Sequence, residues 1–273
     1  MLLNKALSCE ALLKDWFKEH PRVLVALSGG VDSCLLSYLA RKYCGKQNAV
    51  ALIGVSPSLK QRELENAKHF CNNHDIVLQE IFPDELSDPN YAANPVNRCY
   101  FCKHALFTTM HSVRQYQYPD FELINGSNLN DLGDFRPGLA AAQELQALSP
   151  LILCGFDKES IRILAQHYQL EVWDKPASPC LSSRFPYGES ITVEKLKMVE
   201  KAEDLLLDKG FSSVRVRYIQ SAARIEVPLS ELEKLNLLKT ELQDSFKSIG
   251  FYHLEIDQEG LVSGKLNKEI NRL

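Results

Sequence analysis

The stretch VLVALSGGVDSCLLSYL, residues 23–39, decides the fold of this chain. A run of β-type residues enters the turn SGGVDS and leaves as an apolar pattern of helical spacing. A helix that begins directly after a strand presents unpaired N–H groups and partial positive charge, which together bind anions. Gly29 and Gly30 let the backbone approach such a ligand closely, and the hydroxyls of Ser28 and Ser33 add donors.

The same turn excludes two common nucleotide-binding motifs. It lacks the Gly-Lys-Ser/Thr ending of a Walker A loop, so no lysine of the turn reaches a γ-phosphate, and it lacks the G-x-G-x-x-G pattern of dinucleotide sites. Either Asp32 or Ser33 is expected to cap the helix, and Asp32 also to position the loop or a metal ion. The turn therefore predicts a backbone cradle for a phosphate group.

The composition is that of a water-soluble enzyme-sized chain. It has 273 residues, of which 45% are hydrophobic and 24% charged, and its net charge of −4 argues against extensive nucleic-acid binding. No apolar run approaches the roughly 20 residues of a membrane helix, and the N-terminal pattern lacks the features of a signal peptide. We expect a cytoplasmic protein that contacts neither membrane nor nucleic acid and keeps its thiols reduced.

Five of the eight cysteines lie in apolar surroundings and are interpreted as small buried hydrophobes: Cys9, Cys34, Cys44, Cys71 and Cys154.

Strand-like runs alternate with helix-like segments through the first two thirds of the chain. This alternation predicts an α/β fold with a parallel sheet covered by helices on both faces. The predicted strands are residues 22–28, 49–56, 76–82, 121–127 and 150–156, and the predicted helices run from the turn to about residue 43 and over 60–74 and 158–170.

The stretch DKPASPCLSSRFPYGES, residues 174–190, is rich in proline, serine and glycine and is expected to be a functional loop and a boundary. We therefore predict a first domain over residues 1–175 and a smaller α/β domain over 176–273. In the second domain, helices are expected at 193–209 and 229–249, and strands at 213–219, 223–228 and 252–257.

The sequence SGGVDS resembles the signature of the PP-loop ATP pyrophosphatases. That resemblance implies that the loop holds the β- and γ-phosphates of ATP, with Mg²⁺, as pyrophosphate, and that ATP is cut between its α- and β-phosphates. The stretches GSNLNDLGDFRPGLAA, KPASPCLSSRFPYG, VRVR and ARIEVP resemble the LarE family of ATP-dependent sulfur transferases, which act in nickel-pincer cofactor synthesis for lactate racemase. The resemblance spans about residues 22–267 and implies a homo-oligomer. It also implies adenylation of a carboxylate of pyridinium-3,5-biscarboxylic acid mononucleotide, followed by replacement of AMP with sulfur.

Three cysteines stand apart from the others and are assigned to the sulfur chemistry: Cys99, Cys102 and Cys180. Three thiolates with an open fourth position suit a [4Fe–4S] cluster that holds an extra sulfide from an external sulfide donor, whereas zinc would need a fourth ligand. One LarE type gives up the sulfur of a single cysteine, and another carries a Cys-x-x-Cys, a third cysteine and a cluster. Alignment on SSRFPYG places Pro179 at the sacrificial position, so we favour the cluster; donation from Cys180 alone is the alternative.

Arg215 and Arg217 alternate with valines on a predicted strand, so their guanidinium groups share one face, where they can grip a phosphate or merely form a solvated basic edge. Given the resemblance, we assign them to the phosphate of the substrate, helped by Ser183 and Arg184, with Glu203 as a further polar site residue.

Asn128, Asp131 and Asp134 follow the end of a predicted strand, where α/β sheets place ligands. Asp131 is expected to hold Mg²⁺ or orient the substrate, and Gly126 to line the ATP site.

Two rival functions would use the same phosphate cradle. A tRNA thiolation enzyme should show a basic surface or an RNA-binding domain, and a nucleotide-binding regulator needs no cysteine triad.

Overall fold

A computed structural model of the chain describes residues 2–133 and 137–262. It divides into two compact units. The first comprises residues 1–85 and 99–178, and the second comprises residues 86–98 and 179–273. The segment 86–98, which the sequence analysis assigned to the first domain, thus clusters with the second unit. Within that unit, Asn94 donates to the carbonyl oxygen of Pro186 at 2.6 Å, and Tyr91 hydrogen-bonds Ser182 at 2.6 Å.

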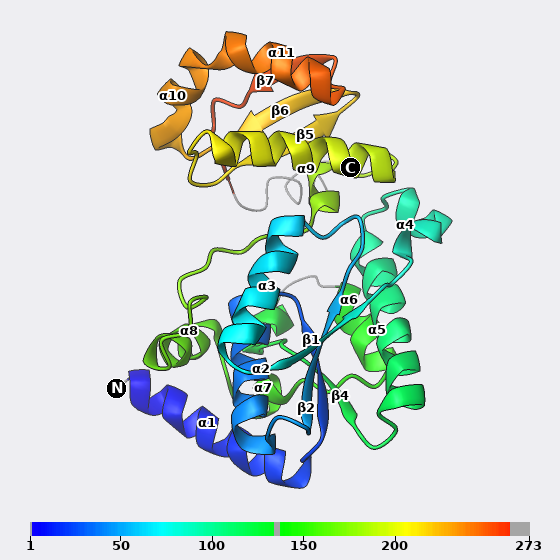
Figure 1. The fold of residues 1–273 in the computed structure, drawn as a ribbon, viewed down its shortest axis with the longest axis vertical. Helices are drawn as coiled ribbons and strands as arrows, with labels where there is room; N and C mark the ends of the chain where they lie inside the picture. The colour runs from blue at the N-terminus through cyan, green and yellow to red at the C-terminus, as the bar shows by residue number, and fades with distance from the viewer. Residues whose placement is uncertain (1, 134–136, 263–273) are drawn as a thin grey trace. The chain divides into compact units, whose positions relative to one another are not determined.

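The first unit is built on a four-stranded parallel sheet, which confirms the predicted α/β fold (Figure 1). The strand order is β3-β2-β1-β4. The strands are β1 (Val23–Leu27), β2 (Ala49–Gly54), β3 (Val77–Ile81) and β4 (Glu122–Asn125).

Apolar side chains of alternate strand residues build a core on each face of this sheet. Val23 and Val25 of β1 belong to one core, whereas Leu24 belongs to the other. The first core includes residues of α1 (Leu2–Glu19), α2 (Val31–Cys44), α3 (Gln61–Asn73) and α8 (Lys158–His167). The second includes residues of α5 (Arg98–Gln117) and α6 (Pro137–Glu144). The β1–α2 junction is therefore fixed from both sides.

The predicted strand over residues 150–156 is wrong. The structure has the short helix α7 (Pro150–Leu153) there, and it ends before Gly155, whose φ is +77°. Ser149 precedes the helix as its N-cap residue and Pro150 occupies the first turn, where a missing N–H costs nothing. The helix-start residues Ser149 and Pro150 thus decided the local structure, and the apolar run that follows them formed a helix and not a strand.

The second unit contains a three-stranded mixed sheet in the order β5-β6-β7, in which β5 pairs antiparallel to β6 and β6 parallel to β7. Its strands are β5 (Arg215–Ile219), β6 (Ala222–Glu226) and β7 (His253–Ile256). Its helices are α4 (Pro89–Ala92), α9 (Val193–Asp208), α10 (Leu232–Leu237) and α11 (Lys239–Ile249). The predicted helix over 229–249 is broken at Leu238, which separates α10 from α11. Among the described residues, no helix is both long and apolar enough to cross a membrane.

Candidate active site

The turn between β1 and α2 is a cradle of backbone N–H groups. Gly29 has a φ of +74°, a left-handed conformation that glycine adopts more readily than any other residue. Within residues 2–133 and 137–262, the N–H groups of Gly29 and Gly30 donate to no protein acceptor. Because α2 begins at Val31, these donors add to the unpaired N–H groups and positive dipole of its first turn. The turn is shaped to bind an anion.

Serine hydroxyls hold this turn in place. Ser33 Oγ accepts from the Ser28 N–H at 3.1 Å, donates to the Gly30 carbonyl oxygen at 3.1 Å and lies 3.0 Å from Ser28 Oγ. The expectation that Asp32 or Ser33 caps α2 is wrong, because Gly30 is the N-cap residue and no side chain caps the helix. The Ser33 hydroxyl instead closes the turn on itself.

Asp32 points to a lysine from a distant helix. Lys158 Nζ lies 2.8 Å and 2.6 Å from the two carboxylate oxygens of Asp32, and Asn128 Nδ2 lies 3.4 Å from one of them. Lys158 is the first residue of α8, so the structure supplies the lysine that the turn itself lacks. A carboxylate beside a phosphate cradle is an appropriate Mg²⁺ ligand, and here a lysine balances its charge.

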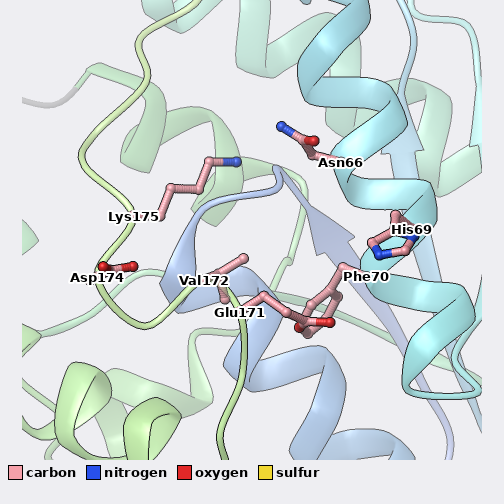
Figure 2. Close-up of a pocket in the computed structure, with 7 residues that line it drawn as sticks. All are labelled: Asn66, His69, Phe70, Glu171, Val172, Asp174 and Lys175. Carbon is pink, nitrogen blue, oxygen red and sulfur yellow. The ribbon is translucent and has the colours of Figure 1, made fainter. Parts of the chain in front are cut away.

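A second lysine holds the other side of the turn. Lys175 Nζ donates to the carbonyl oxygen of Gly29 at 2.9 Å and to Glu63 Oε2 at 2.6 Å. Lys175 also lines a cavity of about 340 Å³ between α3 and residues 171–175; the other lining residues are Asn66, His69, Phe70, Glu171, Val172 and Asp174 (Figure 2). Sequence reasoning assigned no role to either lysine.

Gly126 and Asp131 lie where β4 ends. A Cβ added to Gly126 would lie 2.9 Å from the Ser33 nitrogen and 3.0 Å from its Cα, so only glycine lets this strand end approach α2 so closely. Asp131 is buried and its carboxylate accepts from the Asn128 N–H at 3.0 Å, which shapes the loop that presents Asn128 to Asp32. Asp134 lies outside the described residues.

The three assigned cysteines are accessible to different degrees. Cys99 and Cys180 are exposed and Cys102 is half-buried; Cys99 and Cys102 are three residues apart on α5, so they share a face of that helix. Among the described residues, no group of three or more His, Cys, Asp or Glu side chains is arranged to hold a metal ion. Cys99 and Cys102 belong to the first unit and Cys180 to the second.

Burial raises the pKa of the remaining cysteines and so lowers their thiolate fraction. Desolvation raises the pKa of Cys71 to about 12 and the pKa of Cys154 to about 11, and it raises the pKa of Cys34 further still. Burial also raises the pKa of the half-buried Cys44 to about 11. The interpretation of Cys34 in the turn helix as a core residue agrees with its complete burial.

In the second unit, three arginines and two glutamates form one buried cluster. Arg184 donates to Glu203 through Nε at 2.7 Å and Nη2 at 3.1 Å. Arg217 pairs with Glu226 in the same two-point manner, at 2.9 Å and 3.2 Å. Arg215 lies 3.8 Å from the Glu226 carboxylate. Among the described residues of this cluster, two carboxylates pair with three guanidinium groups, so the cluster carries a net positive charge.

That surplus charge belongs chiefly to Arg215. Burial lowers the pKa of Arg215, and the neighbouring Arg217 and Arg184 lower it further. An anion bound there would relieve the repulsion among the three guanidinium groups. Sequence reasoning missed Glu226, although β6 alternates polar and apolar residues and places Glu226 opposite Arg215 in the register of β5 and β6.

The same cluster is hydrogen-bonded to the backbone beside Cys180. Ser183 Oγ donates to the Cys180 carbonyl oxygen at 2.7 Å, and Arg184 Nη1 donates to it at 3.1 Å. Arg217 Nη1 donates to the Ser183 carbonyl oxygen at 2.8 Å. The second unit therefore brings together the predicted substrate residues, Ser183, Arg184, Glu203, Arg215 and Arg217, next to an exposed cysteine.

Comparison with known proteins identifies the family. Residues 1–81 match the model of a PP-loop domain. Over 263 residues the chain is 32% identical to the pyridinium-3,5-bisthiocarboxylic acid mononucleotide synthase of Lactiplantibacillus plantarum, covering 96% of this chain and 95% of that protein. It is also 44% identical over 265 residues to an uncharacterised protein of Synechocystis, covering 95% and 97%, and 29% identical over 260 residues to one of Methanocaldococcus jannaschii, covering 95% and 98%. The chain therefore belongs to the LarE-type PP-loop sulfur transferases, which are ATP-dependent enzymes.

Proposed function

We propose that this enzyme adenylates a carboxylate of pyridinium-3,5-biscarboxylic acid mononucleotide and then replaces AMP with sulfur. A carboxylate oxygen of the substrate attacks the α-phosphorus of Mg-ATP, and the bond to pyrophosphate breaks. A sulfur nucleophile then attacks the acyl carbon, and AMP leaves as the C–O bond breaks. The thiocarboxylate is the product. The likeness to the Lactiplantibacillus synthase, named for the bisthiocarboxylic acid form of this mononucleotide, supports this choice of substrate.

The chain has candidate groups for binding both the pyrophosphate of ATP and the phosphate of the substrate. In the proposal, the N–H groups of Gly29 and Gly30 bind the leaving pyrophosphate and stabilise its charge as it develops. Asp32, with Asp131 shaping the loop beside it, would hold Mg²⁺, which would supply neutralising charge for the phosphates. Arg215 binds the substrate phosphate in the second unit, while Glu203 and Glu226 hold Arg184 and Arg217 in position.

The observation that carries the proposal is the buried arginine cluster bonded to the backbone of Cys180. It combines an anchor for an anionic substrate with a sulfur-bearing side chain, and a nucleotide-binding regulator needs neither. In the proposal, Cys99, Cys102 and Cys180 would hold a cluster that supplies sulfide from an external donor for attack on the acyl carbon. Without a cluster, the Cys180 thiolate would itself attack the acyl carbon and AMP would leave. Elimination at the Cβ–Sγ bond of Cys180 would then release the thiocarboxylate and leave dehydroalanine.

The proposal is tested by incubating the protein with Mg-ATP, the dicarboxylate mononucleotide and sulfide under anaerobic conditions. We expect pyrophosphate release together with a product whose mass shows oxygen replaced by sulfur. Cys180→Ser should release pyrophosphate but form no thiocarboxylate, and Cys44→Ala, which changes a cysteine outside the site, should do both. Thiolation of tRNA in place of the mononucleotide would instead establish the rival function.

Two sources of the sulfur are considered, a [4Fe–4S] cluster and Cys180 itself, and the iron content of the protein distinguishes them. The exposed Cys99 and Cys180 and the half-buried Cys102 support a [4Fe–4S] cluster, and donation from Cys180 alone is the alternative. Anaerobic purification with iron and sulfide, followed by absorption and EPR spectroscopy, tests the cluster. Iron that is lost when Cys99, Cys102 and Cys180 are each replaced by alanine supports it. An iron-free protein whose Cys180 becomes dehydroalanine during turnover establishes sacrificial donation.

A further inference from the structure

The carbonyl oxygen of Gly29 is held by a charged donor from a remote part of the chain. Lys175 Nζ lies 2.9 Å from this oxygen, and 146 positions separate the two residues in sequence. The Lys175 side chain is mostly buried, with 18% of its surface exposed. Bringing an ammonium group to a backbone carbonyl in a largely buried position requires compensation, and Glu63 provides it at 2.6 Å.

The consequence of this contact lies at the other end of the same peptide group. In a planar trans peptide the C=O and the following N–H point in opposite directions. The Gly29 carbonyl faces Lys175, so the Gly30 N–H points away from Lys175. Because residues on both sides of this peptide are glycines, the group can flip with little steric resistance. Its orientation therefore depends on what holds the carbonyl.

Lys175 is itself held on two sides. Glu63 on α3 binds its ammonium group, and Arg162 on α8 donates to the carbonyl oxygens of Trp173 and Lys175, each at 2.8 Å. Figure 2 shows Lys175 on the segment that faces α3 across the cavity. The ammonium position is thus set by α3 and its backbone by α8. Both helices pack in the core under the turn.

We propose that Lys175 is a positioning residue for ATP. It fixes the Gly29–Gly30 peptide so that the Gly30 N–H faces the leaving pyrophosphate, and its charge polarises that N–H into a stronger donor. This inference rests on the proposed placement of pyrophosphate at the turn, but not on the identity of the carboxylate substrate. Removing a donor of this kind costs about 10²–10³-fold in rate. Releasing its orientation should cost less, about 10–100-fold.

The test compares Lys175→Met with Lys175→Arg, which keeps a cationic donor, and with Lys68→Met. Lys68 is the matched control, because it lies on the same helix as Glu63 and pairs with Glu80 away from the turn. Pyrophosphate release is measured with saturating carboxylate substrate, and the ¹⁵N–¹H shift of the Gly30 amide is followed during titration with inorganic pyrophosphate. We expect Lys175→Met to lose about 10–100-fold in kcat and most of the Gly30 response. Lys175→Arg should recover both, and Lys68→Met should change neither.

Three results would overturn the inference. They are an unchanged rate in Lys175→Met, an arginine variant as defective as the methionine variant, or weakened binding with the full Gly30 response. The last result would mean that Lys175 contacts ATP itself. If Lys175→Met fails to fold, Glu63→Gln gives the same readouts, with a loss of about 3–10-fold expected because the lysine remains but is less firmly held. A wild-type protein that binds pyrophosphate yet rejects the dicarboxylate mononucleotide would refute the proposed function and leave this inference intact.

Discussion

Replacing Gly126 with alanine should displace the start of α2 and so distort the proposed phosphate cradle. The new Cβ would lie 2.9 Å from the Ser33 nitrogen and 3.2 Å from the Asp32 carbonyl carbon. Both are backbone atoms of the first turn of α2, so no side chain can rotate away and the helix start must shift. Overpacking of this kind costs about 2 kcal/mol, which for a unit of this size lowers Tm by about 4–8 °C.

Gly30→Ala is the matched comparison, because the space at Gly30 is open. A Cβ there would meet only Ser28 Oγ, at an ordinary 3.5 Å, and Gly30 has a φ of −82° that any residue adopts. We therefore expect Gly30→Ala to keep the wild-type Tm while blocking the close approach of a phosphate to the cradle. Gly126→Ala should lose both stability and binding.

Thermal unfolding and calorimetric titration with a non-hydrolysable ATP analogue measure the two effects separately. A Gly126→Ala protein with unchanged Tm and affinity would refute the packing argument. A Gly30→Ala protein that binds the analogue normally would show that pyrophosphate does not lie against this turn.

Three further predictions concern the rest of the molecule. Glu203→Ala should destabilise the second unit by about 3–5 kcal/mol in urea unfolding, because it leaves the Arg184 charge buried and unpaired; a loss below about 1 kcal/mol would contradict this. Burial opposes ionisation of Asp157, but hydrogen bonds from Lys5 and Ser160 outweigh it and lower its pKa to about 2. The ionised form is therefore favoured by folding, and a screened contribution of about 1 kcal/mol, present above pH 4, should fade as the pH falls toward 2; Asp157→Asn should flatten this dependence in acid-unfolding curves. In iodoacetamide labelling of the native protein followed by mass spectrometry, exposed Cys99 and Cys180 should react first, and rapid labelling of buried Cys34 would contradict the assigned core.

Local sequence patterns predicted the strand, the glycine turn and the helix of the phosphate cradle, because each depends on residues that are close in sequence. The strand that precedes the glycine turn and the periodic helix that follows it are set by neighbouring residues, as are Ser33 and the two glycines of the cradle. The same reasoning failed at residues 150–156, where an apolar run of ambiguous length became a helix because Ser149 and Pro150 form a good helix start. An apolar run alone does not choose between strand and buried helix.

The charged partners of the site were not predictable in this way. Lys158 and Asp32 are 126 positions apart, and their contact depends on which helix packs beside α2. Glu226 meets Arg215 and Arg217 only because β5 and β6 pair in one particular register, and a shift by one residue would turn the glutamate to the apolar face. Sheet order and register are long-range properties that a single sequence leaves open.

These long-range contacts change how the missing Walker lysine is understood. A Walker loop carries its lysine in the turn, whereas here two lysines reach the turn from one later segment, Lys158 at the start of α8 and Lys175 shortly after its end. That segment continues in sequence to Cys180, the proposed sulfur donor. In the proposed function, the lysine charges beside the phosphate cradle and the cysteine that supplies sulfur are therefore carried on one continuous stretch of chain.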